Sequence, residues 1–445
     1  MKQTIQLSDH FGYRRLIRFT APSVLMMVFT SIYGVVDGFF VSNFVGKTPF
    51  AAVNFIMPFL MVVGALGFMF GTGGSALIAK MMGEGQNERA QRVFSLLIYA
   101  TFASGVVIAA VSIALIRPIA AFLGASGDML EDCVVYSRII LVALPFLMLQ
   151  YAFSSLVVAA EKPNLGLILT VVAGVINMVC DALFMVVFEW GIVGAALATA
   201  LGQIVGGIVP LVYFTCQNPT RFRLGRTGWD GAALGRICVN GSSELMSNIS
   251  MSVVGMLYNA QLMHYAGEDG VAAYGTIMYV NFIFISIFIG FATGVAPVIS
   301  YHFGAGNRKE LKGLLKRSTV IVLLASVVMF VVALFMGETL ASIFVGYDAA
   351  LLAMTAHAFE IYAFSFFFAG LAIFGSAFFT ALNDGLTSAL ISFLRTLLFQ
   401  SAAVMLMPLV WDLDGIWLSA VAAECMAVLV SAVFLIAKRK RYGYF

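Results

Sequence analysis

Long apolar runs, separated by short polar segments, organise the chain and predict membrane-spanning α-helices. Each run has about 20 residues or more, the length that a helix needs to cross the hydrocarbon core of a bilayer. We expect twelve spans, at residues 16–41, 51–78, 93–116, 135–160, 164–188, 191–214, 237–263, 271–301, 318–336, 357–382, 386–410 and 415–437. The predicted fold class is an all-α polytopic membrane protein with twelve transmembrane helices.

The composition excludes the main alternatives to this fold class. Hydrophobic residues make up 61% of the chain and charged residues 11%, against about 45–50% and 25% in soluble domains. These values exclude a soluble globular domain and a disordered chain. A membrane β-barrel would instead show short strands that alternate apolar and polar residues.

The placement of basic residues predicts the orientation in the membrane. Lys and Arg fall mainly in the N-terminal segment, in the loops around 80–92, 162, 221–236 and 308–317, and in the tail 438–441. Because basic loops stay in the cytoplasm, both termini are expected there. We interpret the Arg-rich stretch 221–236 in the same way, and not as a nucleic-acid surface. The polar start lacks the apolar core of a signal peptide, so the first span is expected to direct insertion.

The chain also repeats itself with a shift of about 221 residues. This shift places Gly73 on Gly294, Gly83 on Gly304 and Gly85 on Gly306. We expect two pseudo-symmetric six-helix bundles related by an axis along the membrane normal, with a cleft between them. The N-lobe is predicted at 1–215, the cytoplasmic linker at 216–236 and the C-lobe at 237–445. One large bundle with coincidental glycines remains the alternative.

Two aspartates lie inside apolar runs, where an ionised carboxylate costs a few kcal/mol. Asp37 is in the first span and Asp181 in the fifth. With a rise of 1.5 Å per residue, both are roughly 27–28 Å from the cytoplasmic ends of their spans, in the outer half of the first bundle. Residues of this kind usually face a water-filled cavity or bind a cation, so both are candidate functional residues.

Other polar groups accompany the two aspartates at helical spacing. Asn177 is one turn before Asp181, and Ala195 and Thr199 form another i, i+4 pair in the sixth span. Carboxylate, amide, hydroxyl and carbonyl oxygens suit a small hard cation. Alternatively, the two carboxylates share a proton. Asn177 and Thr199 bonding only to nearby backbone is the structural alternative.

Two more residues of the first span are candidates for supporting roles. Tyr33, one turn before Asp37, is expected to hydrogen-bond to it. Pro22 lies fifteen residues before Asp37 and permits a bend, because proline removes a backbone hydrogen bond. The alternative is that Pro22 simply marks the start of the helix.

The second half carries different buried charges. Glu244 lies early in the seventh span among serines and Asn248, and we expect both residues to line the cleft. Arg395 and Glu424 each lie roughly 15 Å from a membrane face and are expected to form an ion pair that fixes packing. Phe and Met residues are expected to add adaptable surface to the cleft.

The repeat predicts different roles for the two lobes. Position 37 corresponds to Tyr258, which we also place in the cleft, and position 181 to Val404. The two aspartates therefore have no counterpart in the second half. One lobe is expected to bind the driving cation, while the other mainly shapes the substrate cleft.

Together these features resemble the multidrug and toxic compound extrusion (MATE) family over nearly the whole chain. The resemblance rests on the two six-span lobes, on the glycine-rich end of the second span with Gly83 and Gly85, and on Pro22, Asp37, Asn177, Asp181, Ala195 and Thr199. It implies a prokaryotic member with a cation site in the N-lobe. There the side-chain oxygens of Asp37, Asn177, Asp181 and Thr199 and the carbonyl of Ala195 would bind the ion, and Pro22 would bend the first helix.

Some members of the family use a C-lobe cation site, with acids on the seventh and tenth spans. Glu244 matches the first of these acids, but residues 364–380 of the tenth span contain none. The resemblance therefore favours coupling through the N-lobe.

The function that the resemblance implies is antiport. An amphipathic organic cation would enter the cleft from the cytoplasm, and Na⁺ or H⁺ arriving from outside at Asp37 and Asp181 would make the lobes rock and release it. No cofactor, nucleic acid or obligate protein partner is expected besides the coupling ion, the small substrate and membrane lipid. The expected location is the cytoplasmic membrane of a bacterium or archaeon.

Three other functions compete with this one. A lipid-linked oligosaccharide or polysaccharide flippase of the same superfamily would need a more cationic cleft, whereas the buried charges here are mainly acidic. A major facilitator transporter would have a glycine-containing charged loop after its second span, which residues 83–89 resemble only loosely. A membrane-embedded enzyme is disfavoured because the four histidines are scattered and no HExxH, GxSxG or P-loop motif occurs. The five cysteines lack metal-ligand spacing and are expected to pack in apolar surroundings.

Overall fold

The computed structural model of the chain describes residues 5–346 and 348–444. Its helices are α1 (Tyr13–Phe44), α2 (Lys47–Gly83), α3 (Asn87–Leu123), α4 (Gly127–Ala159), α5 (Pro163–Asp181), α6 (Gly191–Thr215), α7 (Gly231–Gly304), α8 (Arg308–Val345), α9 (Ala349–Ala381), α10 (Gly385–Phe393), α11 (Gln400–Leu406) and α12 (Pro408–Tyr442). Two π-helical segments extend this series, η1 (Ala182–Val187) after α5 and η2 (Leu394–Phe399) between α10 and α11.

The helices confirm the predicted all-α membrane fold. In the described part of the chain, eleven helical segments are long and apolar enough to cross a membrane. One of them, α7, has 74 residues and includes two predicted spans. Its backbone is not helical at Gly267 (φ 63°, ψ −150°), where the first span ends and the chain turns back into the second. α12 breaks in the same way at Trp411 and Asp412, so its first residues end the eleventh span. Twelve spans result.

The segment between α6 and α7 lies along the N-terminal part of α3. Tyr99 donates a hydrogen bond to the carbonyl of Gly225 at 3.3 Å, and Thr227 donates to the carbonyl of Arg92 at 3.0 Å. α7 begins at Gly231, earlier than the predicted residue 237, because the side chain of Asp230 accepts a hydrogen bond from the backbone N–H of Ala233 and caps the helix. The division into lobes at 1–215, 216–236 and 237–445 stays a prediction.

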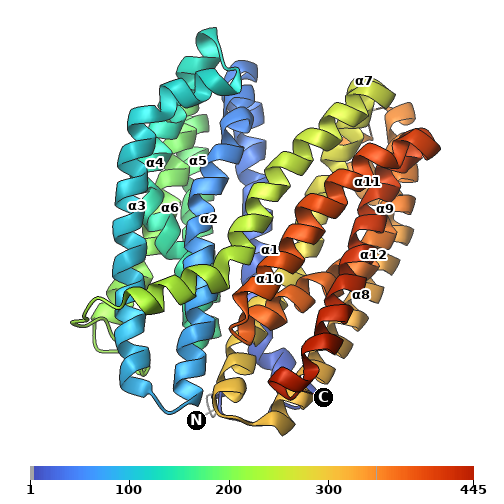
Figure 1. Ribbon diagram of the computed structural model, residues 1–445. Helices are drawn as coiled ribbons and strands as arrows, with labels where there is room; N and C mark the ends of the chain where they lie inside the picture. The colour runs from blue at the N-terminus through green and yellow to red at the C-terminus, as the bar shows by residue number, and fades with distance from the viewer. Residues whose placement is uncertain (1–4, 347, 445) are drawn as a thin grey trace.

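The helices form two groups, α1–α6 and α7–α12 (Figure 1). The groups lie close together at the end that carries both chain termini and separate toward the opposite end (Figure 1). Where they meet, glycines bring backbones into contact. An added Cβ on Gly73 of α2 would overlap the carbonyl oxygen of Ile237 in α7, and one on Gly290 of α7 would lie 2.5 Å from the Cα of Val24 in α1.

The backbone repeats in the two halves at the predicted register. Left-handed conformations occur at Gly85 (φ 78°) and Gly306 (φ 66°), and at Glu161 (φ 61°) and Asn383 (φ 58°). A third such pair is Glu189 (φ 52°) and Asp412 (φ 48°). A positive φ is uncommon in non-glycine residues, so pairs of such turns 221–223 residues apart in the sequence show that the halves share one chain path. The alternative of coincidental glycines is therefore wrong.

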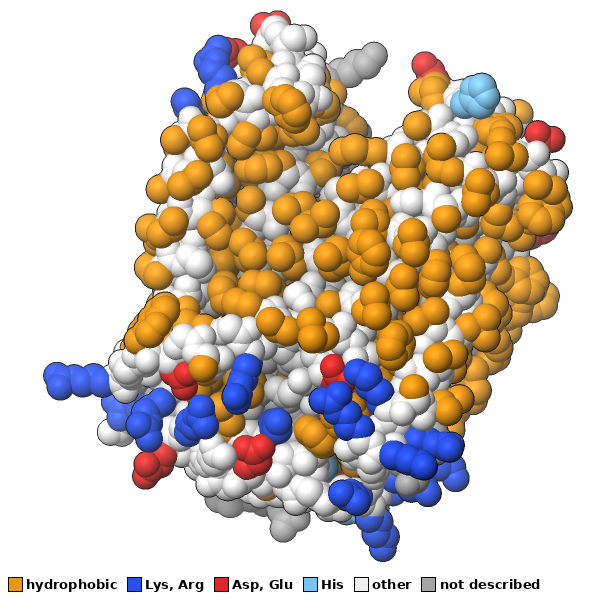
Figure 2. All heavy atoms as spheres, viewed as in Figure 1, with side chains coloured by type: hydrophobic (Ala, Val, Ile, Leu, Met, Phe, Trp, Pro, Cys, Tyr) orange, Lys and Arg blue, Asp and Glu red, His pale blue; other side chains and the backbone are white. Residues whose placement is uncertain are grey.

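The surface is that of a multi-pass membrane protein. Hydrophobic side chains cover a broad band around the middle of both groups, and Lys and Arg gather mainly at the end that carries the termini (Figure 2). Large hydrophobic side chains face outward, and Phe335 on α8 is 79% exposed. At the opposite end a notch opens between the two groups (Figure 2).

Candidate functional site

Three helices of the first half bring the predicted site residues together. Asp37 lies on α1, Asp181 is the last residue of α5, and Thr199 lies on α6. The hydroxyl of Thr199 donates a hydrogen bond to Oδ1 of Asp37 at 3.3 Å. Asn177 and Asp181 also lie close enough to Asp37 to influence its carboxyl group. Residues far apart in the sequence therefore form one polar cluster.

Glycines allow these helices to approach each other closely. An added Cβ on Gly174 of α5 would lie 3.0 Å from the ring of Tyr33, and one on Gly202 of α6 would lie 3.0 Å from the Cβ of Asn177. Any larger residue at either position would push α5 away from a neighbouring helix. The close packing fixes the relative positions of the oxygen atoms.

The cluster contains buried oxygen atoms that have no donor. Asp181 is 0% exposed and Asn177 3%. Among the described residues, neither carboxylate oxygen of Asp181 nor the amide oxygen of Asn177 has a hydrogen-bond partner. A buried charge without a partner is costly, and two ionised carboxylates cannot hydrogen-bond to each other. A bound cation or a proton on one carboxyl group lowers that cost. The oxygen atoms of the cluster therefore fit Na⁺ or H⁺.

The remaining predicted residues of this half lie at or near the cluster. Ala195 is fully buried, one turn from Thr199 on α6. Tyr33 interacts electrostatically with Asp37, but in the described structure no hydrogen bond joins the two, contrary to the prediction. Pro22 is buried well inside α1, which begins at Tyr13. The alternative that Pro22 marks the helix start is therefore wrong, while its role as a bend point stays a prediction.

Two features of the cluster escaped the sequence analysis. The buried phenol of Tyr136, on α4, lies close enough to Asp37 and Asp181 to interact with both electrostatically. η1 begins directly after Asp181, and π-helical turns occur frequently at functional sites. Neither feature could be recognised in the sequence. One tyrosine and one π-helical turn change neither the hydropathy nor the spacing of polar residues in a distinctive way.

The second half joins Arg395 and Glu424 in a buried ion pair. Nε of Arg395 donates to both carboxylate oxygens, at 3.1 and 2.9 Å, and Nη2 donates to Oε1 at 2.8 Å. Arg395 lies within η2, so both π-helical segments adjoin a buried charge. Glu244 on α7 interacts electrostatically with Arg395, and Asn248 donates to the backbone carbonyl of Glu244 at 2.8 Å.

Tyr258 does not line a cleft in this structure, contrary to the prediction. It is 2% exposed and its ring stacks on that of Tyr274, with 5.0 Å between the centroids. Its hydroxyl lies 2.7 Å from Oγ of Ser419 and donates to Gln400 at 3.1 Å. Both groups belong to the second half, so Tyr258 holds that bundle together.

Comparison with known proteins identifies relatives along almost the entire chain. The multidrug export protein MepA of Staphylococcus saprophyticus is 24% identical over 431 residues, covering 96% of this chain and 94% of the relative. MepA of Staphylococcus haemolyticus is 26% identical over 345 residues, covering 77% and 76%. These relatives are named as export proteins and not as enzymes, in agreement with the predicted transporter.

Solved structures share the fold of the whole chain. An outward-facing conformation of a multidrug resistance MATE family transporter of the MOP superfamily superposes with a TM-score of 0.93 at 21% identity, covering 100% of this chain and 99% of that one. A MATE crystal structure in the straight conformation gives a TM-score of 0.91 at 21% identity, covering 99% and 98%. The sequence profile of the MatE family matches residues 22–183 and 245–404, one stretch in each half. The chain therefore belongs to the MatE family, as its resemblance predicted.

Proposed function

We propose that this protein is a cation-coupled antiporter that exports amphipathic organic cations across the cytoplasmic membrane of a bacterium or archaeon. The observation that carries the proposal is the neighbouring pair of Asp37, which is partly exposed, and Asp181, whose buried carboxylate oxygens have no donor among the described residues. A structural role alone would not require two neighbouring carboxylates inside an apolar bundle. Relatives named as multidrug export proteins support the export of small molecules.

The driving ion is proposed to bind among the same oxygens. Asp37, Asn177, Asp181 and Thr199 would hold Na⁺ through side-chain oxygens and Ala195 through its carbonyl. The bound Na⁺ would compensate one of the two negative charges of Asp37 and Asp181. If the ion is H⁺, one proton shared by Asp37 and Asp181 has the same electrostatic effect. Both ions lower the cost of the uncompensated buried charge.

The orientation follows from the positive-inside rule. The end with both termini is rich in Lys and Arg and is proposed to face the cytoplasm (Figure 2). The notch at the opposite end then opens outward, so this conformation is one in which an external ion reaches the site and a substrate leaves. Asp37 is partly exposed in it, which agrees with such access.

α1 supplies a direct link between the ion site and the second half. Ser31, less than two turns before Asp37, donates a hydrogen bond to the carbonyl of Phe282 in α7 at 3.3 Å. A change in charge at Asp37 alters the contacts of α1 with α5 and α6, and a movement of α1 then alters its contact with α7. Coupling requires that ion and substrate favour different arrangements of the halves.

The cationic character of the substrate is proposed from the charges that remain uncompensated. Glu244 on α7 interacts electrostatically with Arg395, but the hydrogen bonds of Arg395 go to Glu424. The carboxylate of Glu244 is therefore left for a cationic substrate. A flippase for a pyrophosphate-linked lipid would need free cationic groups at this depth. Arg395 is already neutralised by Glu424, which disfavours that alternative.

The test is transport by purified protein in proteoliposomes, with ethidium as the probe and Na⁺ and pH gradients imposed separately. The variants Asp37→Asn and Asp181→Asn should reduce gradient-driven transport to the level of empty vesicles. Asp128→Asn removes an exposed carboxylate at the outer start of α4 and should transport as the wild type does. Normal transport by both site variants would overturn the proposal. The gradient that drives transport identifies the ion.

A further inference from the structure

The segment before α1, residues 5–12, contacts both halves of the molecule at the proposed cytoplasmic end. On the side of the first half, the backbone N–H of Leu7 donates to Oε1 of Glu161 at 2.8 Å. Glu161 lies in the turn between α4 and α5. Leu7 is 0% exposed, and the segment continues directly into α1. It is therefore attached to the first half by the chain itself and by this contact.

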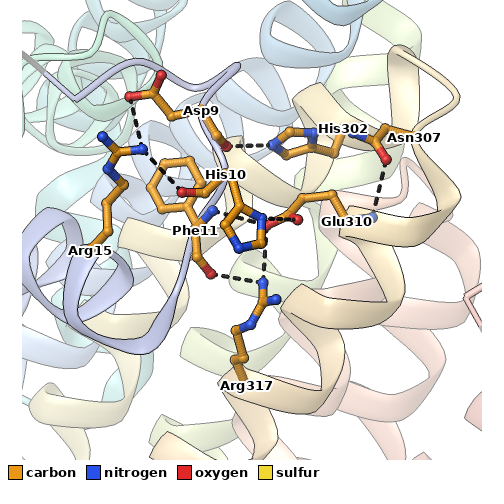
Figure 3. Close-up of polar contacts among 8 residues, drawn as sticks. All are labelled: Asp9, His10, Phe11, Arg15, His302, Asn307, Glu310 and Arg317. Atoms are coloured by element: carbon orange, nitrogen blue, oxygen red, sulfur yellow. Dashed lines mark hydrogen bonds and ion pairs between the residues drawn. The ribbon is translucent and has the colours of Figure 1, made fainter.

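Glu310, in the first turn of α8, holds the same segment from the side of the second half (Figure 3). Its Oε1 accepts a hydrogen bond from the backbone N–H of Phe11 at 3.0 Å, and its Oε2 lies 2.7 Å from Nδ1 of His10. Arg317, two turns further along α8, donates from one nitrogen to Oε1 of Glu310 at 3.0 Å and to the carbonyl of Phe11 at 2.8 Å. Glu310 is 6% exposed, so its bond to the backbone of Phe11 is shielded from water, whereas the side chain of His10 is 69% exposed.

The end of α7 adds a third contact from the second half. Nε2 of His302 donates to the carbonyl oxygen of Asp9 at 3.2 Å. The ring of Phe11 is 0% exposed and packs edge-on against Phe19 and His302, with 5.6 and 6.5 Å between the ring centroids. A polar segment that lacks a helix is thus fixed by backbone hydrogen bonds and one buried aromatic anchor.

We propose that residues 5–12 form a latch that holds the cytoplasmic end closed, and that the latch must detach from Glu310, Arg317 and His302 before this end can open. The inference rests on the proposed alternating access. The segment remains joined to the first half, so separation of the halves breaks its contacts with α7 and α8. The contact between Leu7 and Glu161 lies within the first half and persists. The strength of the Glu310 contacts therefore sets the balance between the two conformations.

The test measures this balance without measuring transport. Spin labels are attached to cysteines at the exposed positions Gln86, between α2 and α3, and Lys312, on α8, in a background without native cysteines. Double electron–electron resonance then gives the distance distribution across the cytoplasmic end. Glu310→Gln should raise the ratio of the longer to the shorter distance by about tenfold, the effect of losing one charge-assisted hydrogen bond.

Glu161→Gln is the matched control, because it makes the same chemical change at the other attachment of the segment. It should leave the ratio as in the wild type. An unchanged distribution in Glu310→Gln, or an equal shift in both variants, would overturn the latch. If Glu310→Gln does not fold, Arg317→Gln replaces it, because Arg317 donates both to the carbonyl of Phe11 and to Glu310. It should shift the ratio in the same direction, and an unchanged distribution in Arg317→Gln would also overturn the latch.

The result separates the latch from the proposed function. If Asp37→Asn loses transport and Glu310→Gln leaves the distance distribution unchanged, the proposed antiporter stands and the latch is excluded. If Glu310→Gln shifts the distance distribution and both aspartate variants transport normally, the latch stands and the proposed ion site is excluded.

Discussion

Gly83 and Gly304 stand at corresponding positions of the two halves, and each lies against the backbone of the other half. A Cβ on Gly83 of α2 would overlap the carbonyl oxygen of Tyr301 in α7, and a Cβ on Gly304 would overlap that of Lys80 in α2. Lys80 and Tyr301 are themselves related by the shift of 221 residues. The two contacts therefore form a pseudo-twofold seal, at the end where the basic residues gather (Figure 2).

Replacing either glycine should make closure of this end less favourable. Gly83→Ala or Gly304→Ala places a methyl group where a carbonyl oxygen lies, and overpacking of this kind costs about 1–3 kcal/mol. We expect the population of the conformation seen here to fall about tenfold and ethidium export to fall with it. Distance measurement between labels at Gln86 and Lys312 checks the population. Gly235→Ala, where a Cβ meets nothing within 4 Å, is the control, and a wild-type distribution in both seal variants would contradict the expectation.

The fold was predictable because hydropathy and helix-breaking residues act locally in the sequence. The length of apolar runs predicted the spans, and Gly267 and Asp412 broke the helices between predicted spans. The repeat was visible in glycines because close backbone contact, as at Gly83 and Gly304, tolerates no side chain. These features depend on the residue type at one position and so can be recognised without coordinates.

The candidate cluster was predictable only where charge and helical spacing carried the signal. Asp37 and Asp181 stood out because ionised groups are costly in a membrane. Tyr136 was missed because a buried tyrosine in a span resembles any packing aromatic residue. The contact between His10 and Glu310 was missed because it joins positions 300 residues apart in the sequence. Tyr258 was misplaced because correspondence in a repeat gives a position along a helix and not the direction in which the side chain points.

Thr199 should tune the affinity of the proposed ion site. Its hydroxyl donates to Asp37, and a hydrogen bond to a charged group contributes about 1.5–3 kcal/mol. If the hydroxyl also contributes an oxygen to the ion, Thr199→Val removes a ligand, and the ion concentration for half-maximal export should rise about tenfold. Thr199→Ser keeps the hydroxyl and should restore the wild-type value. The measurement is ethidium transport against Na⁺ concentration and against pH. Equal behaviour of the valine variant and the wild type would exclude Thr199 from the site.

The ion pair of Arg395 and Glu424 should stabilise the second half without taking part in transport. Removing one partner leaves a buried charge uncompensated, so Arg395→Met or Glu424→Gln should lower the free energy of unfolding by about 3–5 kcal/mol. Replacing both residues by Met should recover most of this loss, because neither member of the pair is left with an unpaired charge. Thermal unfolding in detergent checks the double-mutant cycle. Loss of export in a stable double variant would instead give the pair a role in transport.

Docking of residues 5–12 should weaken as the pH falls below about 6.5. His302 lies beyond the predicted end of the eighth span, and burial lowers its pKa, while Glu310 partly opposes this shift. When the segment detaches, the pKa of His302 returns toward 6.5, and protons then bind preferentially to the detached state. The stability that docking gains from neutral His302 is therefore present above pH 6.5 and is lost as the pH falls toward the lowered pKa.

Glu310 adds a second loss at lower pH. Burial alone would raise its pKa, but the N–H of Phe11, His10 and Arg317 together lower it below its usual value of 4.5. This contribution is present above pH 4.5 and is lost below it. Nδ1 of His10 lies 2.7 Å from Oε2 of Glu310, so the experiment is done in a His10→Gln background, which leaves His302 as the histidine that contacts the segment. A spin label at the exposed Ser8 should become more mobile between pH 7.5 and 5.5. His302→Gln should abolish the change in that interval, and a persistent change would assign the pH dependence to another group.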